Sequence, residues 1–149
     1  MARMSTHLEN ELRAFVADRE RAVAERDREA LLGVHASDVT SFPVLPPSRT
    51  VGTAAVAEGL QAWFDGYSEG PGYEVRDLEV GGEGDLGHCA FRYHVTGVLQ
   101  DGSEVDMWVR ATLVCRRVDG AWRVVHQHES VPFDPATGAA LISAGPDDD

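Results

Sequence analysis

His94 and Glu129 are the two side chains of this sequence whose chemistry best suits the movement of protons. A carboxyl group enclosed by apolar groups holds its proton more readily, and a nearby imidazole can exchange protons with it. General acid–base catalysis of this kind typically contributes about 10²–10⁴-fold in rate. We therefore take His94 and Glu129 as the candidate catalytic pair. The alternatives are a buried ion pair without a catalytic role and a glutamate in water at the rim of a pocket.

Two other arrangements near the C-terminus have residue types that do chemistry elsewhere. His126 and His128 have the spacing of two metal ligands on one strand face, but their best neighbours are Arg110 and Thr112, and an arginine beside a metal is unfavourable. Ser130 and His128 have the residue types of a hydrolase dyad, but the chain has no Gly-x-Ser-x-Gly turn. Dinucleotide fingerprints and P-loops are absent too. We expect neither a metal nor a cofactor.

The composition excludes several classes of partner. The 149 residues carry a formal net charge of −12, from 25 acidic and 13 basic residues. This excess argues against nucleic acid and against anionic membranes, because both present phosphates. The polar N-terminal region has no stretch typical of a signal peptide, and no apolar run approaches the length of a membrane span. We expect a cytoplasmic protein with one domain over residues 5–133 and a flexible acidic tail over residues 134–149.

Hydrophobic periodicity indicates which elements must position the candidate residues. A helical stripe near the N-terminus consists of Leu8, Leu12, Phe15, Val16, Arg19 and Val23, with a capping box from Thr6 to Glu9. Further helices are expected over residues 27–34 and 53–67, and Gly70-Pro71-Gly72 is expected to end the last one. Strands are expected over residues 38–42, 73–80, 88–99, 104–117 and 121–131.

This order of elements predicts an α+β domain, with helices packed on one face of a curved antiparallel sheet. The links Asp101-Gly102 and Asp119-Gly120 are typical of hairpin turns between antiparallel strands.

The segment from Arg110 to Asp134, RATLVCRRVDGAWRVVHQHESVPFD, resembles the SnoaL-like group of the nuclear transport factor 2-like superfamily. It is also similar to the association domain of calcium/calmodulin-dependent kinase II. The matching elements are Arg110-x-Thr112, Arg116-Arg117, Asp119-Gly120-x-Trp122 and His126-x-His128-x-Ser130, and upstream the segment RDREALLGVHASDV. The resemblance covers residues 10–133.

The resemblance implies a cone-shaped α+β barrel, in which three N-terminal helices pack on a strongly curved antiparallel sheet around an internal pocket. Members of the superfamily include steroid isomerases, polyketide cyclases, dehydratases and epoxide hydrolases, as well as domains without catalytic activity, so the fold does not settle the function. The kinase association domain has pocket arginines that suit carboxylates, and these positions fall at His94, Leu113 and Glu129. We therefore expect no anion site of that kind. The aspartate base of the steroid isomerases has its nearest counterpart at Asp38, in a passage that is commonly structural.

The register of the hairpins decides which side chains share a face. We prefer a three-residue turn at Val118-Asp119-Gly120, which keeps the family-like arginine, threonine and histidines together, and a two-residue turn at Asp101-Gly102. A two-residue turn at Asp119-Gly120 would mix the two faces. In the preferred register Cys89 and Cys115 lie on opposite faces, which disfavours a disulfide.

This register predicts an apolar pocket with few polar groups, the usual character of a small-molecule site. The catalytic pair would lie there with the substrate-binding residues Trp63, Phe64, Arg92, Val109, Leu113 and Gln127. The opposite face would carry a dimer interface or structural network of Trp108, Arg110, His126 and His128.

We expect a cofactor-independent isomerase, cyclase or dehydratase that acts on a small hydrophobic molecule of polyketide or steroid type, and that forms a homodimer. The alternative is a ligand-binding or oligomerisation domain without catalytic activity.

Overall fold

The computed structural model describes residues 5–149, which form an α+β domain as expected. The elements in chain order are α1 (Thr6–Ala24), α2 (Arg28–Gly33), β1 (His35–Phe42), β2 (Thr50–Val51), α3 (Thr53–Asp65), β3 (Tyr67–Glu83), β4 (Leu86–Leu99), β5 (Glu104–Val118), β6 (Ala121–Ser130) and a 3₁₀ turn, η1 (Pro146–Asp148). Helix α3 is shorter than expected, because Tyr67 already begins β3, and Gly70-Pro71-Gly72 lies inside that strand.

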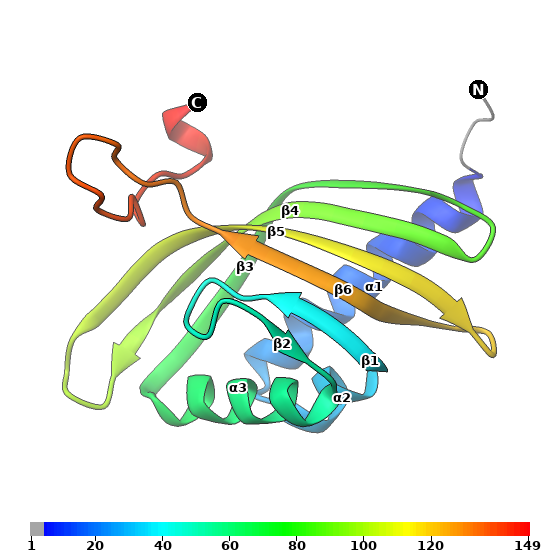
Figure 1. The fold of residues 1–149 in the computed structure, drawn as a ribbon, viewed down its shortest axis with the longest axis horizontal. Coiled ribbons are helices and arrows are strands. Elements are labelled where there is room, and N and C mark those ends of the chain that lie inside the picture. Colours follow the sequence, from blue (N-terminus) through cyan, green and yellow to red (C-terminus); the bar gives the residue numbers. More distant parts are fainter. Residues whose placement is uncertain (1–4) are drawn as a thin grey trace.

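The strands form one sheet in the order β2-β1-β6-β5-β4-β3. Adjacent strands of this sheet are antiparallel, except that β1 and β6 run parallel to each other. The expectation of a wholly antiparallel sheet is therefore wrong. The sheet curls strongly, but β2 and β3 remain as open edges (Figure 1), so it is not a closed barrel. Helices α1 and α2 precede the strands, whereas α3 follows β2.

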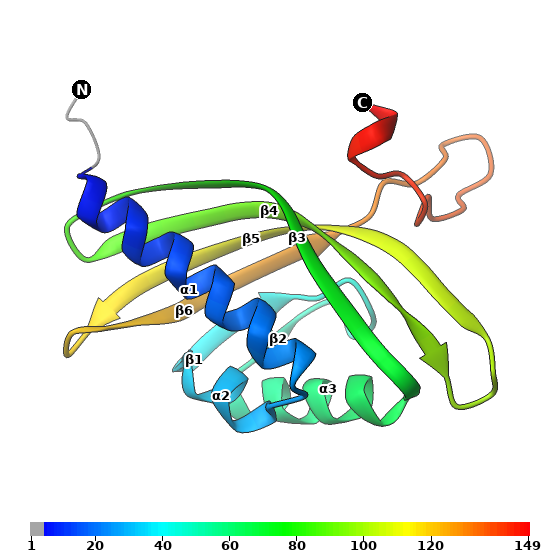
Figure 2. The same ribbon diagram turned by 180° about the vertical axis from the view of Figure 1, so that it is seen from behind.

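Helix α1 crosses one face of the sheet (Figure 2), and we call this the inner face and the opposite one the outer face. Ser5, not Thr6, caps the helix, because its side chain accepts a hydrogen bond from the backbone N–H of Leu8 at 3.1 Å. Leu12 and Val16 are fully buried in the same core cluster as Leu113 of β5. The apolar stripe of the sequence therefore faces the sheet, as its periodicity predicts.

The turn between β4 and β5 contains three residues, not two. The backbone N–H of Leu99 donates to the carbonyl of Ser103 at 2.8 Å, which encloses Gln100, Asp101 and Gly102. Gly102 has a φ of 87°, a conformation that glycine adopts without steric cost.

This difference of one residue exchanges the two faces of β4. Tyr93 pairs with Val109 on the inner face, whereas His94 pairs with Trp108 and Arg92 with Arg110 on the outer face. The expected position of His94 and Arg92 inside the pocket is therefore wrong.

The turn between β5 and β6 is one residue shorter than expected, whereas the turn between β4 and β5 is one residue longer. Asp119 and Gly120 have φ values of 53° and 79°, and Val118 pairs with Ala121, which is a two-residue turn. Positive φ at both central residues is the geometry that twisted hairpins favour and that Asp-Gly adopts readily. The expected three-residue turn is therefore wrong.

A β-bulge at Val125 then restores part of the expected arrangement. Trp122 and Val124, which precede the bulge, lie on the inner face and are buried. The register shifts after Val124, so that Gln127 pairs with Leu113 on the inner face. Glu129 is on the inner face as well, as expected.

The two cysteines also share the inner face, contrary to expectation. Cys89 pairs with Leu113, and Cys115 pairs with Gly87 two residues along, so the two thiols are neighbours. Both are free and fully buried. The hydrogen bond to Cys89, together with burial, raises the pKa of the Cys115 thiol. We interpret both as packing residues.

The C-terminal tail lies against the outer face, where the sequence predicts a loose segment. The backbone N–H of Trp108 donates to the carbonyl of Ile142 at 2.7 Å. Gly145 covers the Trp108 indole so closely that an added Cβ would lie 2.6 Å from its nitrogen. Arg92 forms a salt bridge of 2.7 Å with Asp149.

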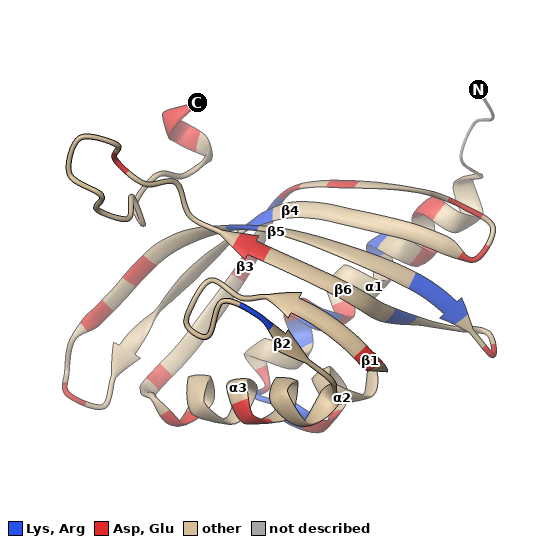
Figure 3. Ribbon diagram, viewed as in Figure 1, with Lys and Arg blue, Asp and Glu red and all other residues tan. Residues whose placement is uncertain are grey.

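The acidic residues are dispersed. Figure 3 shows Asp and Glu spread over the helices, the hairpins and the tail rather than gathered on one surface. Within residues 5–149, no helix has the length and apolar character needed to cross a membrane.

Candidate functional site

Five polar side chains meet on the inner face and form what we call the inner polar cluster: Arg19 of α1, Tyr73 of β3, Tyr93 of β4, and Gln127 and Glu129 of β6. Arg19 donates to the Tyr73 hydroxyl at 3.4 Å and to the Gln127 amide oxygen at 3.3 Å. Gln127 donates to Glu129 at 2.8 Å, and the Tyr93 hydroxyl donates to the other Glu129 oxygen. The two tyrosine rings stack at 4.5 Å, which closes a ring of contacts.

The local sequence explains how each element presents its member of the cluster. Arg19 follows Val16 by three residues and Leu12 by seven, so it lies on the buried stripe of α1. Tyr93 is on the inner face of β4 because side chains alternate along a strand. Gln127 and Glu129 reach that face through the bulge in β6.

Burial and charge set the proton affinities within the cluster. Burial raises the pKa of Tyr73 to about 12, against the opposing effect of Arg19. Burial, followed by the charge of Glu129, raises the pKa of Tyr93 well above its ordinary value. Burial alone would lower the pKa of Arg19, but Tyr73 and Glu129 outweigh it and the net shift is upward. At neutral pH the cluster therefore holds two neutral phenols and one guanidinium.

His35 of β1 lies beside the cluster and is buried. Its Nδ1 is 2.6 Å from the carbonyl of Leu31, which assigns the ring proton to Nδ1 because a carbonyl only accepts. Burial, followed by the charge of Arg19, lowers the pKa of His35 to about 4. This histidine is therefore neutral at physiological pH.

The expected substrate-binding residues of the inner side are divided between two apolar groups. Val109 and Leu113 are fully buried in the main core beside the cluster. Trp63 contacts the Tyr73 ring edge-on at 6.5 Å, and so adds an aromatic wall. Phe64 is buried in a separate group with Leu31 and two residues of α1.

His94 and Glu129 are not brought together. The His94 ring stacks on Trp108 at 4.5 Å on the outer face, and its Nε2 lies 2.6 Å from Asp106. Arg92 is also outside, in a salt bridge of 2.6 Å with Asp77 as well as its contact with the tail. The expected proximity of His94 and Glu129 is therefore wrong, because the two side chains point to opposite sides of the sheet.

The outer face gathers the other residues that the sequence singled out. Arg110 donates to the Ser130 hydroxyl at 3.0 Å. His126 and His128 both pack edge-on against Phe42, at ring distances of 4.9 and 5.3 Å. Within residues 5–149, no three His, Cys, Asp or Glu side chains are grouped so that they could hold a metal ion.

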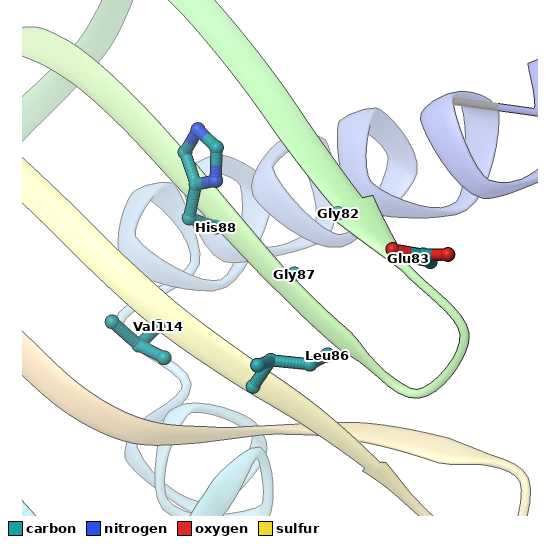
Figure 4. Close-up of a pocket in the computed structure, with 6 residues that line it drawn as sticks. All are labelled: Gly82, Glu83, Leu86, Gly87, His88 and Val114. Carbon is teal, nitrogen blue, oxygen red and sulfur yellow. The ribbon is translucent and has the colours of Figure 1, made fainter. Parts of the chain in front are cut away.

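Two hollows on the surface of residues 5–149 lie near residues discussed above. A hollow of about 310 Å³ between α1 and α2 includes Arg19, with Phe15 and Leu31 on its apolar wall. A larger hollow of about 650 Å³ lies at the end of the β3–β4 hairpin (Figure 4), and it is lined by Gly82, Glu83, Leu86, Gly87, His88 and Val114. Of these two hollows, the first includes Arg19 of the inner polar cluster and the second includes none of its members.

Four residues of the site were not predicted from the sequence: Arg19, Tyr73, Tyr93 and His35. A signal for Arg19 was present, because it is the one charged residue in an otherwise apolar helical stripe. The tyrosines carried no such signal, because aromatic side chains are common on any buried strand face.

Comparisons with known proteins agree with this fold. The model of the SnoaL-like domain family matches residues 12–134. A nuclear transport factor 2-like protein of unknown function from Pseudomonas putida KT2440 is 28% identical, with a TM-score of 0.88 over 97% of this chain and 100% of that one. A search of curated proteins finds no match.

Two further solved structures are similar at lower identity. A candidate calcium/calmodulin-dependent protein kinase II association domain from Xanthomonas campestris is 19% identical, with a TM-score of 0.71 over 80% of this chain and 84% of that one. A candidate dehydratase of the nuclear transport factor 2-like family from Streptomyces avermitilis is 18% identical, with a TM-score of 0.71 over 81% and 93%.

Proposed function

The chain belongs to the SnoaL-like domain family, and from this premise we propose that it is an enzyme that moves a proton on a small, largely hydrophobic molecule. The reaction class is isomerisation, cyclisation or dehydration by acid–base chemistry. One observation carries the proposal: the Glu129 carboxylate is half-buried and is held at both oxygens, by Tyr93 and by Gln127. A carboxylate fixed in this way is oriented for proton transfer.

Each residue of the cluster has a distinct part in this proposal. Glu129 accepts a proton from a carbon next to a carbonyl group of the substrate, and the electron pair of the broken C–H bond moves to the carbonyl oxygen. Tyr93 is neutral because its pKa is raised, and its single O–H, which donates to Glu129 in the free protein, turns to the developing oxyanion as Glu129 takes up the substrate proton. Glu129 then returns the proton to the substrate. Gln127 keeps the carboxylate in place.

Deuterium exchange tests this proposal without knowledge of the product. The wild-type protein is incubated in D₂O with a panel of polyketide-like and steroid-like ketones, and label at the carbon beside the carbonyl is measured by mass spectrometry. Glu129→Gln is expected to slow the exchange by about 100-fold or more, because it removes the proton acceptor. The control is Glu104→Gln, an exposed glutamate on β5.

Two results would contradict the proposal. The first is exchange in the presence of the wild-type protein that is no faster than in buffer across the panel. The second is an equal rate for the wild-type protein and Glu129→Gln.

A homodimer through the outer face is a second candidate role, favoured by a specific observation. Phe42 is 40% exposed although it packs against His126 and His128. Val51, whose partner Thr40 lies two residues from Phe42 on the same face, is 52% exposed, and exposed apolar side chains that share a face often mark a surface that a partner buries. Trp108, which we expected at such an interface, is instead covered by Gly145 of the tail.

Light scattering coupled to size exclusion tests the dimer. The wild-type protein is expected to have twice the chain mass of 16.2 kDa, and Phe42→Asp is expected to have that mass once. Val118→Asp, at the exposed β5–β6 turn, is the matched control and is expected to remain dimeric. A monomeric wild-type protein would reject this candidate.

A further inference from the structure

We propose that the ligand of the inner site carries a carboxylate group, which binds the guanidinium of Arg19. The proposal rests on the proposed function for the location of the site, and it adds the chemical class of the molecule. Its starting point is a buried nitrogen: Nη1 of Arg19 has no hydrogen-bond partner. Leaving a buried N–H of a charged group without a partner is costly, so such a group normally has an acceptor.

The partners that Arg19 does have are neutral and distant. Its contacts to the Tyr73 hydroxyl and the Gln127 amide oxygen are 3.4 and 3.3 Å long, whereas charged N–H···O⁻ bonds are typically about 2.7–2.9 Å. Among the ion pairs of residues 5–149, none joins Arg19 to a carboxylate. A guanidinium with a buried, unpartnered N–H is normally paired with an anion, so one is expected here.

Glu129 does not fill this role directly. Its two oxygens accept from Tyr93 and from Gln127, and Gln127 stands between Glu129 and the guanidinium. Glu129 therefore acts on Arg19 through its charge alone, without a direct hydrogen bond. His35 is neutral at physiological pH and adds neither a compensating nor a competing charge. The free edge of the guanidinium is left for an external acceptor.

The surroundings favour a singly charged carboxylate over a phosphate. Asp18, Glu25 and Asp27 line the same hollow as Arg19, with Arg21 as the only other cation of that lining. A dianion would be repelled by this acidic rim, whereas one carboxylate matches the fork of a single guanidinium. Phe15, Leu31 and Val34 of the same hollow supply apolar surface for the rest of the molecule.

Benzoate and its uncharged counterpart benzamide test the proposal. Binding to the wild-type protein is measured by isothermal titration, and the side-chain signal of Arg19 is followed by NMR of ¹⁵N-arginine-labelled protein. We expect benzoate to bind and to shift the Arg19 signal, and benzamide to bind about tenfold more weakly or worse. Equal binding of the two probes, or an unmoved Arg19 signal, would overturn the proposal.

Variants separate Arg19 from its neighbours. Arg19→Gln is expected to weaken benzoate binding by about tenfold or more, and Arg21→Gln, which removes an exposed arginine of the same hollow, is expected to leave it within about twofold. Benzoate binding by Arg19→Gln at the wild-type affinity would overturn the proposal. Should Arg19→Gln fail to fold, the NMR result on the wild-type protein still decides.

The two proposals can fail independently. Benzoate binding at Arg19 without any deuterium exchange would reject the proposed reaction but keep the carboxylate site. Exchange that depends on Glu129, with no preference for benzoate over benzamide, would reject the carboxylate site but keep the reaction.

Discussion

Lowering the pH from neutral to about 4 is expected to lower the free energy of unfolding by about 3 kcal/mol through His35 alone. The pKa of this histidine is about 4 in the folded protein and 6.5 in its ordinary state. Between these values the unfolded chain binds more protons than the folded one, so stability decreases as the pH falls. The contribution of neutral His35 to the free energy of unfolding is therefore fully present above pH 6.5 and is lost as the pH falls towards 4.

Denaturant unfolding at a series of pH values measures this effect in the wild-type protein and in His35→Leu. The variant loses the hydrogen bond to Leu31, but its stability should depend less on pH over this interval. The control is His88→Gln, which removes an exposed histidine of the outer face. Parallel pH profiles for the wild-type protein and His35→Leu would show that His35 is not responsible.

Leu12→Ala is expected to lower the free energy of unfolding by about 3 kcal/mol, because Leu12 is fully buried where α1 meets the sheet. The reason for its close fit is Gly87 of β4. A Cβ added at Gly87 would lie 2.9 Å from a Leu12 methyl carbon, which is closer than real contacts allow. Gly87→Ala is therefore expected to cost about 1–3 kcal/mol by overpacking.

The double variant with Leu12→Ala and Gly87→Ala shows whether the two substitutions act through their shared contact or independently of each other. Removing the Leu12 side chain makes room for the added methyl group, so the combined loss should be smaller than the sum by about 1 kcal/mol or more. Chemical denaturation of the four proteins gives this coupling energy. Simple additivity would mean that Leu12 does not set the requirement for glycine at position 87.

Elements with strong periodicity could be predicted from the sequence alone. The stripe from Leu8 to Val23 predicted α1 and its buried face, because an apolar surface of that width must pack on a sheet. The order of helices and long strands predicted the α+β class. The parallel pairing of β1 with β6 could not be predicted, because it joins segments far apart in the sequence.

The candidate site was harder to predict, because it depends on the lengths of two turns. Both contain Asp-Gly, yet one encloses three residues and the other two. In the first, the Asp101 side chain accepts from the backbone N–H of Ser103, a local contact that composition does not reveal. Each difference of one residue reverses a whole strand, and this moved His94 out of the pocket and Tyr93 into it.

Glu129 was placed correctly although its assumed turn was wrong. The two-residue turn shifts the pairing of β5 with β6 by one residue from the expected register, and the extra residue Val125 shifts it by one more. A total shift of two residues leaves Glu129 on the same face of the sheet.

That extra residue has a consequence for comparing members of this family. If β6 continued from Val124 without the bulge, His126 and His128 would line the interior, and Gln127 and Glu129 would point outward. The presence of one extra residue thus decides whether histidines or Gln127 and Glu129 lie on the inner face. In a relative whose strand lacks a counterpart of Val125, the residues that correspond to Gln127 and Glu129 still point to the inner face. An alignment without a gap at that position shifts the following residues by one and therefore assigns each of them to the wrong face of the sheet. Homologues of this chain should be aligned by strand face before their catalytic groups are equated.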